Sequence, residues 1–180
     1  METGLHSGYG REIGIIDGVY YRTGGVTDVL IDNPSGSNFY GALVDSSSTL
    51  FVSSAKLRIL NAGQPGGGDP GGIAVSGSSS LNANANLVIS GSHGQGIVVS
   101  GGSHADLDGS SITGSQHGGL VAVNLGTITV NTWDKITSVS GNAVDLFCDS
   151  GSWITGTVHI ANTNVVQCNN VLTYDTVPLP

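Results

Sequence analysis

Short apolar clusters recur along the chain at an interval of 23 or 24 residues. Four segments open alike, and their first apolar residues are Ile73, Ile97, Leu120 and Val144, with Leu43 and Tyr20 extending the series toward the N-terminus. The longer step from Leu43 to Ile73 contains the Gly- and Pro-rich segment 61–71, which predicts an inserted loop at one corner. A repeat of this length predicts a solenoid, in which each coil buries its apolar side chains only against its neighbours.

Each repeat holds three apolar clusters separated by Gly, Ser and His; in one repeat these are residues 97–99, 105–107 and 111–113. Three short strands per coil with glycine-rich corners are typical of a parallel β-helix. The sequence therefore predicts an all-β, right-handed parallel β-helix of about six coils, each of three short strands, over residues 18–167. Residues 1–17 are expected to form an incomplete coil or lead-in segment, and residues 168–180 a C-terminal cap or tail.

Alternation along each strand assigns side chains to the core or to the outer surface. The predicted core columns are Ile73/Val75, Ile97/Val99, Leu120/Ala122 and Val144/Leu146 in the first strand, Ala83, Leu107, Val130 and Ile154 in the second, and Ile89, Ile112, Ile136 and Ile160 in the third. The outer side of the first strand keeps an apolar stripe of Val98, Val121, Val123 and Phe147. Such a stripe needs a partner surface, so it is the predicted subunit interface, with Trp133 packing there too.

The outer side of the second strand is polar and carries the candidate chemistry. Asp106 and Asp108 are two positions apart, roughly 6–7 Å on a strand, and glycosidases place two carboxylates roughly 5–9.5 Å apart. They are the candidate catalytic residues, although Asp108 before a glycine also suits the entry to a turn. Trp153 offers an indole plane for a sugar ring or for a subunit contact. Asn84 and Thr129 complete the candidate glycan-binding set.

Composition narrows the classes of partner. The 180 residues carry a formal net charge of −8 and five Lys and Arg, which form no run. Nucleic acid and anionic membrane surfaces are therefore not expected partners, because both require clustered basic residues. The His residues occupy inconsistent repeat positions, so neither a metal site nor a cofactor is expected. No apolar run has the length of a membrane span, so no membrane insertion is expected.

The two cysteines and the start of the chain bear on the cellular compartment. Cys148 and Cys168 are expected to be small, buried or half-buried thiols, with a single bridge as the alternative. The first residues lack the pattern of a secretory signal. Synthesis in a cytoplasm is expected, unless an export signal lies outside this sequence.

The repeats resemble those of bacteriophage tailspike and tail-fibre proteins of the pectin-lyase-like β-helix group. The Gly-Ile-Val-Val-Ser-Gly-Gly-Ser opening at 96–103 and the Gly-Ser-Ser-Ile-Thr-Gly-Ser segment at 109–115 carry this resemblance, which covers residues 18–167. It implies a trimeric host-attachment protein on a virion tail appendage, made in the host cytoplasm, that binds cell-surface polysaccharide or lipopolysaccharide. No catalytic motif of the group maps onto the chain, so the resemblance assigns no catalytic residue.

Three other functions stay open from the sequence. One is a glycan depolymerase, a hydrolase or lyase, that uses the outward carboxylates. Another is a purely structural stalk or trimerisation segment. The third is a bacterial surface adhesin, which would need an export signal upstream of Met1.

Overall fold

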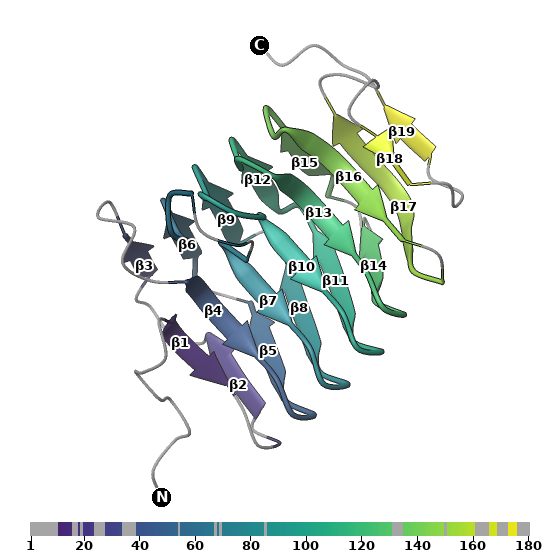
Figure 1. Cartoon of the computed structure of the whole chain (residues 1–180). Helices are drawn as coiled ribbons and strands as arrows, with labels where there is room; N and C mark the ends of the chain where they lie inside the picture. The colour runs from purple at the N-terminus through teal and green to yellow at the C-terminus, as the bar shows by residue number, and fades with distance from the viewer. Residues whose placement is uncertain are drawn as a thin grey trace, which may run out of the picture.

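The computed structural model is a stack of parallel strands that forms a β-solenoid (Figure 1). It describes residues 11–15, 18, 20–23, 28–33, 39–53, 55–66, 68, 70–84, 86–130, 135–149, 151–160, 166–168 and 173–175, with the backbone alone at 11–15, 20–23, 166 and 173–175. Within these residues there is no helix, and hence none long and apolar enough to cross a membrane. The predicted all-β parallel solenoid is thereby confirmed.

Three faces make up the solenoid, here named sheets A, B and C. Sheet A holds β1 (Arg11–Ile15), β4 (Tyr40–Val44), β7 (Ile73–Val75), β10 (Ile97–Val99), β13 (Gly118–Ala122), β16 (Val144–Cys148) and β18 (Val166–Gln167). Sheet B holds β2 (Tyr20–Thr23), β5 (Thr49–Val52), β8 (Ser80–Asn84), β11 (His104–Asp108), β14 (Thr127–Val130) and the first half of β17 (Trp153–Ile160). Sheet C holds β3 (Val29–Asp32), β6 (Leu57–Leu60), β9 (Leu87–Ser90), β12 (Ser111–Thr113), β15 (Thr137–Ser140), the second half of β17, and β19 (Thr173–Asp175).

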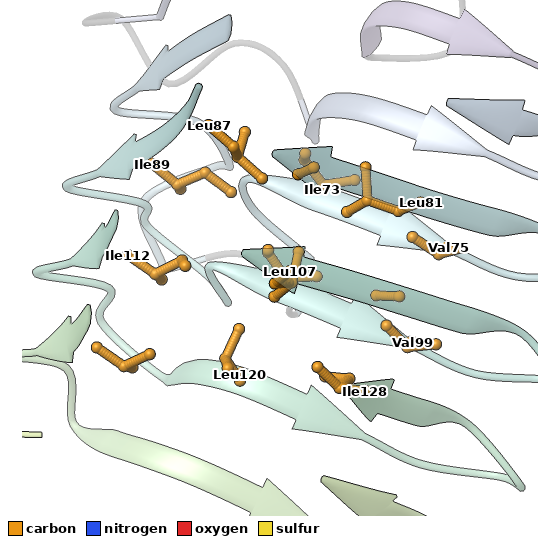
Figure 2. Close-up of a cluster of buried hydrophobic side chains, with 14 of the residues drawn as sticks. Ile73, Val75, Leu81, Leu87, Ile89, Val99, Leu107, Ile112, Leu120 and Ile128 are labelled. Carbon is orange, nitrogen blue, oxygen red and sulfur yellow. The ribbon is translucent and has the colours of Figure 1, made fainter. Parts of the chain in front are cut away.

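The core lies between the three sheets (Figure 2). Its side chains form columns, in which each residue pairs with its counterpart in the next coil. The main column of sheet A is Ala42, Ile73, Ile97, Leu120 and Leu146, all buried. Leu50, Leu81, Ala105, Ile128 and Ile154 form the corresponding column of sheet B, and Ile59, Ile89, Ile112, Val139 and Ile160 that of sheet C. Burial of these stacked side chains is the main stabilising contribution, and no coil can supply it alone.

In four coils a glycine precedes the apolar cluster of sheet A and is required by close packing: Gly41, Gly72, Gly96 and Gly119. A Cβ on Gly96 would overlap Cγ2 of Ile112, and one on Gly72 would lie 2.7 Å from Cγ2 of Ile89. The chain must therefore pass directly over the isoleucine column of sheet C as it enters sheet A. This close approach explains why the repeat opens with Gly in the sequence.

Several predicted column partners are wrong. Ile73 pairs with Ala42 rather than with Leu43, and Tyr20 belongs to sheet B. Val144 pairs with Gly118, so Leu146 is the partner of Leu120. The predicted core position of Val144 is also wrong, because Val144 is half-buried and lies on the outer surface beside Val121 and Phe147. Ile154 continues the column of Ile128, while Val130 pairs with Gly156.

Ile136 is the clearest correction, because it is 56% exposed and Val139 takes its predicted place in the core. Val130 and Val139 are nine positions apart, whereas the equivalent Leu107 and Ile112 are five apart. The corner between sheets B and C is thus longer in this coil. The sequence prediction assumed a constant repeat length. It therefore placed Ile136 in the core column of sheet C, because it made no allowance for the longer corner.

The corner between sheets A and B has the same length in every coil that the structure describes in full. Six positions separate the core residues on its two sides, from Val44 and Leu50 to Ala122 and Ile128. Buried serines form a ladder inside this corner: Ser48 N donates to Ser79 Oγ at 3.0 Å, and Ser79 N donates to Ser103 Oγ at 3.1 Å. These hydroxyls pair backbone N–H groups that would otherwise be buried without an acceptor.

Candidate functional site

The outer surface of sheet A carries the apolar stripe that the sequence predicts. Val98, Val121 and Phe147 are direct neighbours across β10, β13 and β16. Val123 follows the end of β13 and is half-buried, and Trp133 lies outside the described residues. The structure thus brings three of the five residues into one column. Their contact with another subunit stays a prediction.

A groove of about 600 Å³ lies over this column. It is lined by Pro70, Gln95, Val98, Gln116, His117, Gly118, Val121, Val123, Ala143, Val144, Phe147 and Gln167. None of these lining residues is Asp, Glu, Lys or Arg. Val121 on its floor is only 4% exposed, so the single chain already covers the centre of the stripe.

Amide side chains surround the apolar floor of the groove. Gln116 Nε2 lies 2.9 Å from His93 Nδ1, and Gln167 follows Phe147 in the same column. Gln95 Oε1 is buried and has no hydrogen-bond partner within the part of the chain that the structure describes. The groove therefore suits an uncharged occupant with apolar surface and a hydrogen-bond donor.

The outer surface of sheet B has two columns of mainly polar side chains. One is Thr49, Ser80, His104, Thr127 and Trp153, and the other is Phe51, Asn82, Asp106, Thr129 and Thr155. Within the first column, Thr49 Oγ1 lies 2.9 Å from Ser80 Oγ, and His104 Nδ1 lies 2.8 Å from Thr127 Oγ1. Trp153 ends this column with 46% of its surface exposed. The first column is therefore polar along its length and ends at the exposed indole of Trp153.

The predicted catalytic pair occupies two different environments. Asp106 is half-buried between Asn82 and Thr129, on the outer surface. Asp108 is only 4% exposed, and its Oδ1 accepts a hydrogen bond from Lys135 N at 3.2 Å. A buried carboxyl group that accepts a backbone hydrogen bond at a corner stabilises that corner. This agrees with the alternative that Asp108 serves as the entry to a turn. Catalysis by this pair stays a prediction, and the burial of Asp108 argues against it.

The other predicted glycan-binding residues lie at different depths on the same surface. Asn84 is exposed at the end of β8, where it pairs with Asp108. Thr129 is half-buried between Asp106 and Thr155. Thr129 lies one column away from Trp153, because Trp153 pairs with Thr127. The structure therefore places Thr129 near Trp153 and leaves Asn84 several coils away.

A disulfide joins Cys148 to Cys168, with their Cα atoms 4.6 Å apart. The expectation of two free thiols is thus wrong and the alternative of a single bridge is correct. The bridge links the end of β16 to the residue after β18, so it fastens this short strand to sheet A. The spacing of 20 residues is close to one repeat, and this was the available signal in the sequence.

Asp145 is a buried acid in β16. In the register of β13 and β16 it lies beside Gly119, where other coils pack a glycine against sheet C. It is 1% exposed, and its Oδ1 accepts hydrogen bonds from Asn142 Nδ2 at 2.8 Å and Asn142 N at 3.2 Å. Burial raises the pKa of this carboxyl above its ordinary value, and the bonds from Asn142 oppose that shift.

The raised pKa of Asp145 predicts a pH-dependent stability. Folding favours the protonated carboxyl, so its contribution is complete at acid pH and is lost as the pH rises through the folded-state pKa. We expect the free energy of unfolding of the wild type, relative to Asp145→Asn, to fall as the pH rises above about 4, the ordinary pKa of an aspartate. Urea denaturation of both proteins below and above this pH measures the difference. A difference that stays constant or grows with pH would contradict the assignment.

None of the known protein-family models, curated proteins or solved structures matches this chain significantly. The interpretation of its surfaces therefore depends on their own geometry and chemistry.

Proposed function

We propose that this chain is a polysaccharide-binding β-solenoid of a viral host-attachment protein. The observation that carries the proposal is Trp153, which is 46% exposed at the end of the polar column of sheet B. A pyranose ring has an apolar face for an indole and hydroxyl edges for side chains such as Thr127 and Thr129. The viral origin and the place on a tail appendage come from the resemblance of the repeats.

The proposed assembly is a homotrimer of right-handed solenoids of about six coils each. Its support is the groove over Val98, Val121 and Phe147, whose lining contains no Asp, Glu, Lys or Arg. Each chain carries a net charge of −8, so copies approach one another with least repulsion over an uncharged apolar surface. A closed threefold ring would bury this surface in a heterologous contact.

We expect Val98→Asp to dissociate the trimer into single chains. Val98 is half-buried on the floor of the groove, so a carboxylate there would be buried without a partner in the assembly. Val121 is less suitable, because it is already buried in one chain. The matched control is Val88→Asp, at a half-buried position on the outer side of sheet C. Light scattering on a sizing column measures the mass, and an equal effect of both variants would contradict the assignment.

We expect Trp153→Ala to weaken polysaccharide binding about tenfold, because loss of a stacked ring removes about 1.4 kcal/mol. Titration calorimetry with bacterial surface polysaccharides measures the affinity. Ile136→Ala is the control, since Ile136 is 56% exposed and does not belong to the columns of sheet B. Unchanged affinity of Trp153→Ala for a polysaccharide that the wild type binds would refute the placement of the site.

A structural trimerisation segment is the second candidate function, and the apolar groove favours it. It predicts a trimer that binds no polysaccharide on any face. Cleavage of the glycan is not included in the proposal, because Asp108 is buried against the backbone of Lys135.

A further inference from the structure

The turn between β13 and β14 presents an exposed leucine in an unfavourable backbone conformation. Leu125 has φ of +64° and is 66% exposed. Backbone hydrogen bonds stack this turn on the preceding coils, where Ser47, Ser78 and Gly102 occupy the same place. Small or polar residues suit the left-handed region, whereas a leucine is disfavoured there. Neither burial nor backbone preference accounts for Leu125.

Two hydrogen bonds hold this turn in place, one to the next coil and one within the turn. Asn124 N donates to Asp149 Oδ2 at 2.9 Å, and Gly126 N donates to the carbonyl of Val123 at 2.9 Å. The bonds from Ser152 and Asn124 hold the pKa of the Asp149 carboxyl below its ordinary value, so the carboxylate form is favoured. Leu125 is therefore a fixed feature of the surface, because both bonds restrain its turn.

Leu125 and Trp153 lie at the same corner in adjacent coils. Trp153 pairs with Thr127, two residues after Leu125. Leu125 also leans toward the coil of Trp153, since a Cβ built on Gly151 would lie 3.3 Å from Leu125 Cδ2. Gly151 has no side chain to separate the two. These two exposed side chains are here named the Leu125–Trp153 patch, and Thr127 and Asp149 belong to the same corner.

We propose that the Leu125–Trp153 patch binds an uncharged sugar residue that carries a methyl group, with the ring on Trp153 and the methyl group on Leu125. This inference rests on the proposed polysaccharide-binding function and names the substrate class of that site. A hydroxymethyl group at the same place would lose hydrogen bonds to water against Leu125, whereas a methyl group gains apolar contact. A uronic acid would bring its carboxylate toward Asp149 and a chain of net charge −8.

The test uses sugars that differ only at C6. The probes are the methyl glycosides of galactose, its 6-deoxy form fucose and galacturonate, all of the D series, and the corresponding glucose set with quinovose and glucuronate. Saturation-transfer NMR and competition titration give their relative affinities for the full chain. In at least one of the two sets we expect the 6-deoxy sugar to bind about tenfold more tightly than the hexose, with the uronate weakest.

Variants at Leu125 decide whether this side chain causes the preference. Leu125→Gly removes the side chain and suits the left-handed turn, so the melting temperature should be equal or higher while the 6-deoxy preference is lost. Leu30→Ser, at a leucine that is 51% exposed on sheet C, should leave the preference unchanged. Trp153→Ala should weaken all the sugars alike.

Two results would overturn the inference, and they differ in what else they overturn. If hexose and 6-deoxy sugar bind equally, or if Leu125→Gly keeps the preference, the role of Leu125 is wrong and the polysaccharide-binding function stands. If none of the six probes and no surface polysaccharide binds, both the inference and the proposed function are wrong.

Discussion

Replacing Cys148 and Cys168 together by serine is expected to lower the free energy of unfolding by about 3 kcal/mol. The bridge spans 20 residues and encloses the whole of β17, so its loss returns chain entropy to the unfolded state. The effect should be largest in the last coils, because β18 pairs with β16 through just two residue pairs. Urea denaturation gives the change in stability, and amide hydrogen exchange locates it at β16 and β18.

Chemical reduction provides the control for this prediction. Dithiothreitol should lower the stability of the wild type to that of the double serine variant and leave the variant unchanged. Equal stability of the wild type with and without reductant would show that the bridge does not stabilise the native chain.

A serine at position 126 is expected to destabilise the protein by about 3 kcal/mol, even though serine is the repeat's usual residue at this place. Ser48, Ser79, Ser103 and Ser152 all precede a strand of sheet B and are buried, as Gly126 is. A consensus design would therefore complete the serine ladder here. The structure predicts the opposite, because a Cβ on Gly126 would overlap the carbonyl of Val99 and lie 2.9 Å from the carbonyl oxygen of Val123.

The matched control for Gly126→Ser is Gly68→Ser, where a Cβ would meet no atom within 4 Å. Thermal and urea denaturation should show Gly68→Ser within about 0.5 kcal/mol of the wild type. A Gly126→Ser protein as stable as the wild type would mean that the backbone at this corner moves aside easily.

The periodicity of the sequence was sufficient to predict the architecture, because the same burial of apolar side chains and the same parallel strand pairing recur in every coil. Ile73, Ile97 and Leu120 share a column as expected, and Ile89 shares one with Ile112. Each is fixed by the same burial and by the same parallel pairing. The apolar stripe of Val98, Val121 and Phe147 followed from the same alternation.

The errors arose where corners change length. Ile136 has the right spacing from Ile112 for a constant repeat, but the longer corner before β15 moves Val139 into the column. In the same way, Val144 lies 24 residues after Leu120, while the true partner Leu146 lies 26 after it. A single sequence gives the average period and cannot show which corner has gained residues.

The candidate site was the least predictable part. Asp108 has the parity of an outer residue, yet it is buried and its Oδ1 accepts a hydrogen bond from Lys135 N. Leu125 was overlooked because it lies between strands, where hydrophobic alternation has no meaning. Its signal was the alignment of turns, in which a leucine stands where other coils have Ser or Gly. The disulfide was underestimated because its two cysteines become neighbours only when coils stack.

The constant length of the corner between sheets A and B divides the surface into regions with different tolerance for engineering. That corner keeps six positions in each coil, and its buried serine ladder would be broken by any added residue. The corner from sheet C to sheet A already varies, since Ile59 and Ile73 are 14 positions apart whereas Ile89 and Ile97 are eight apart. Foreign loops or peptide tags therefore belong at residues 64–66, which are exposed, and not at Ala62 or Gly63, which are buried. There they would extend outward, and the stack of columns would keep its register.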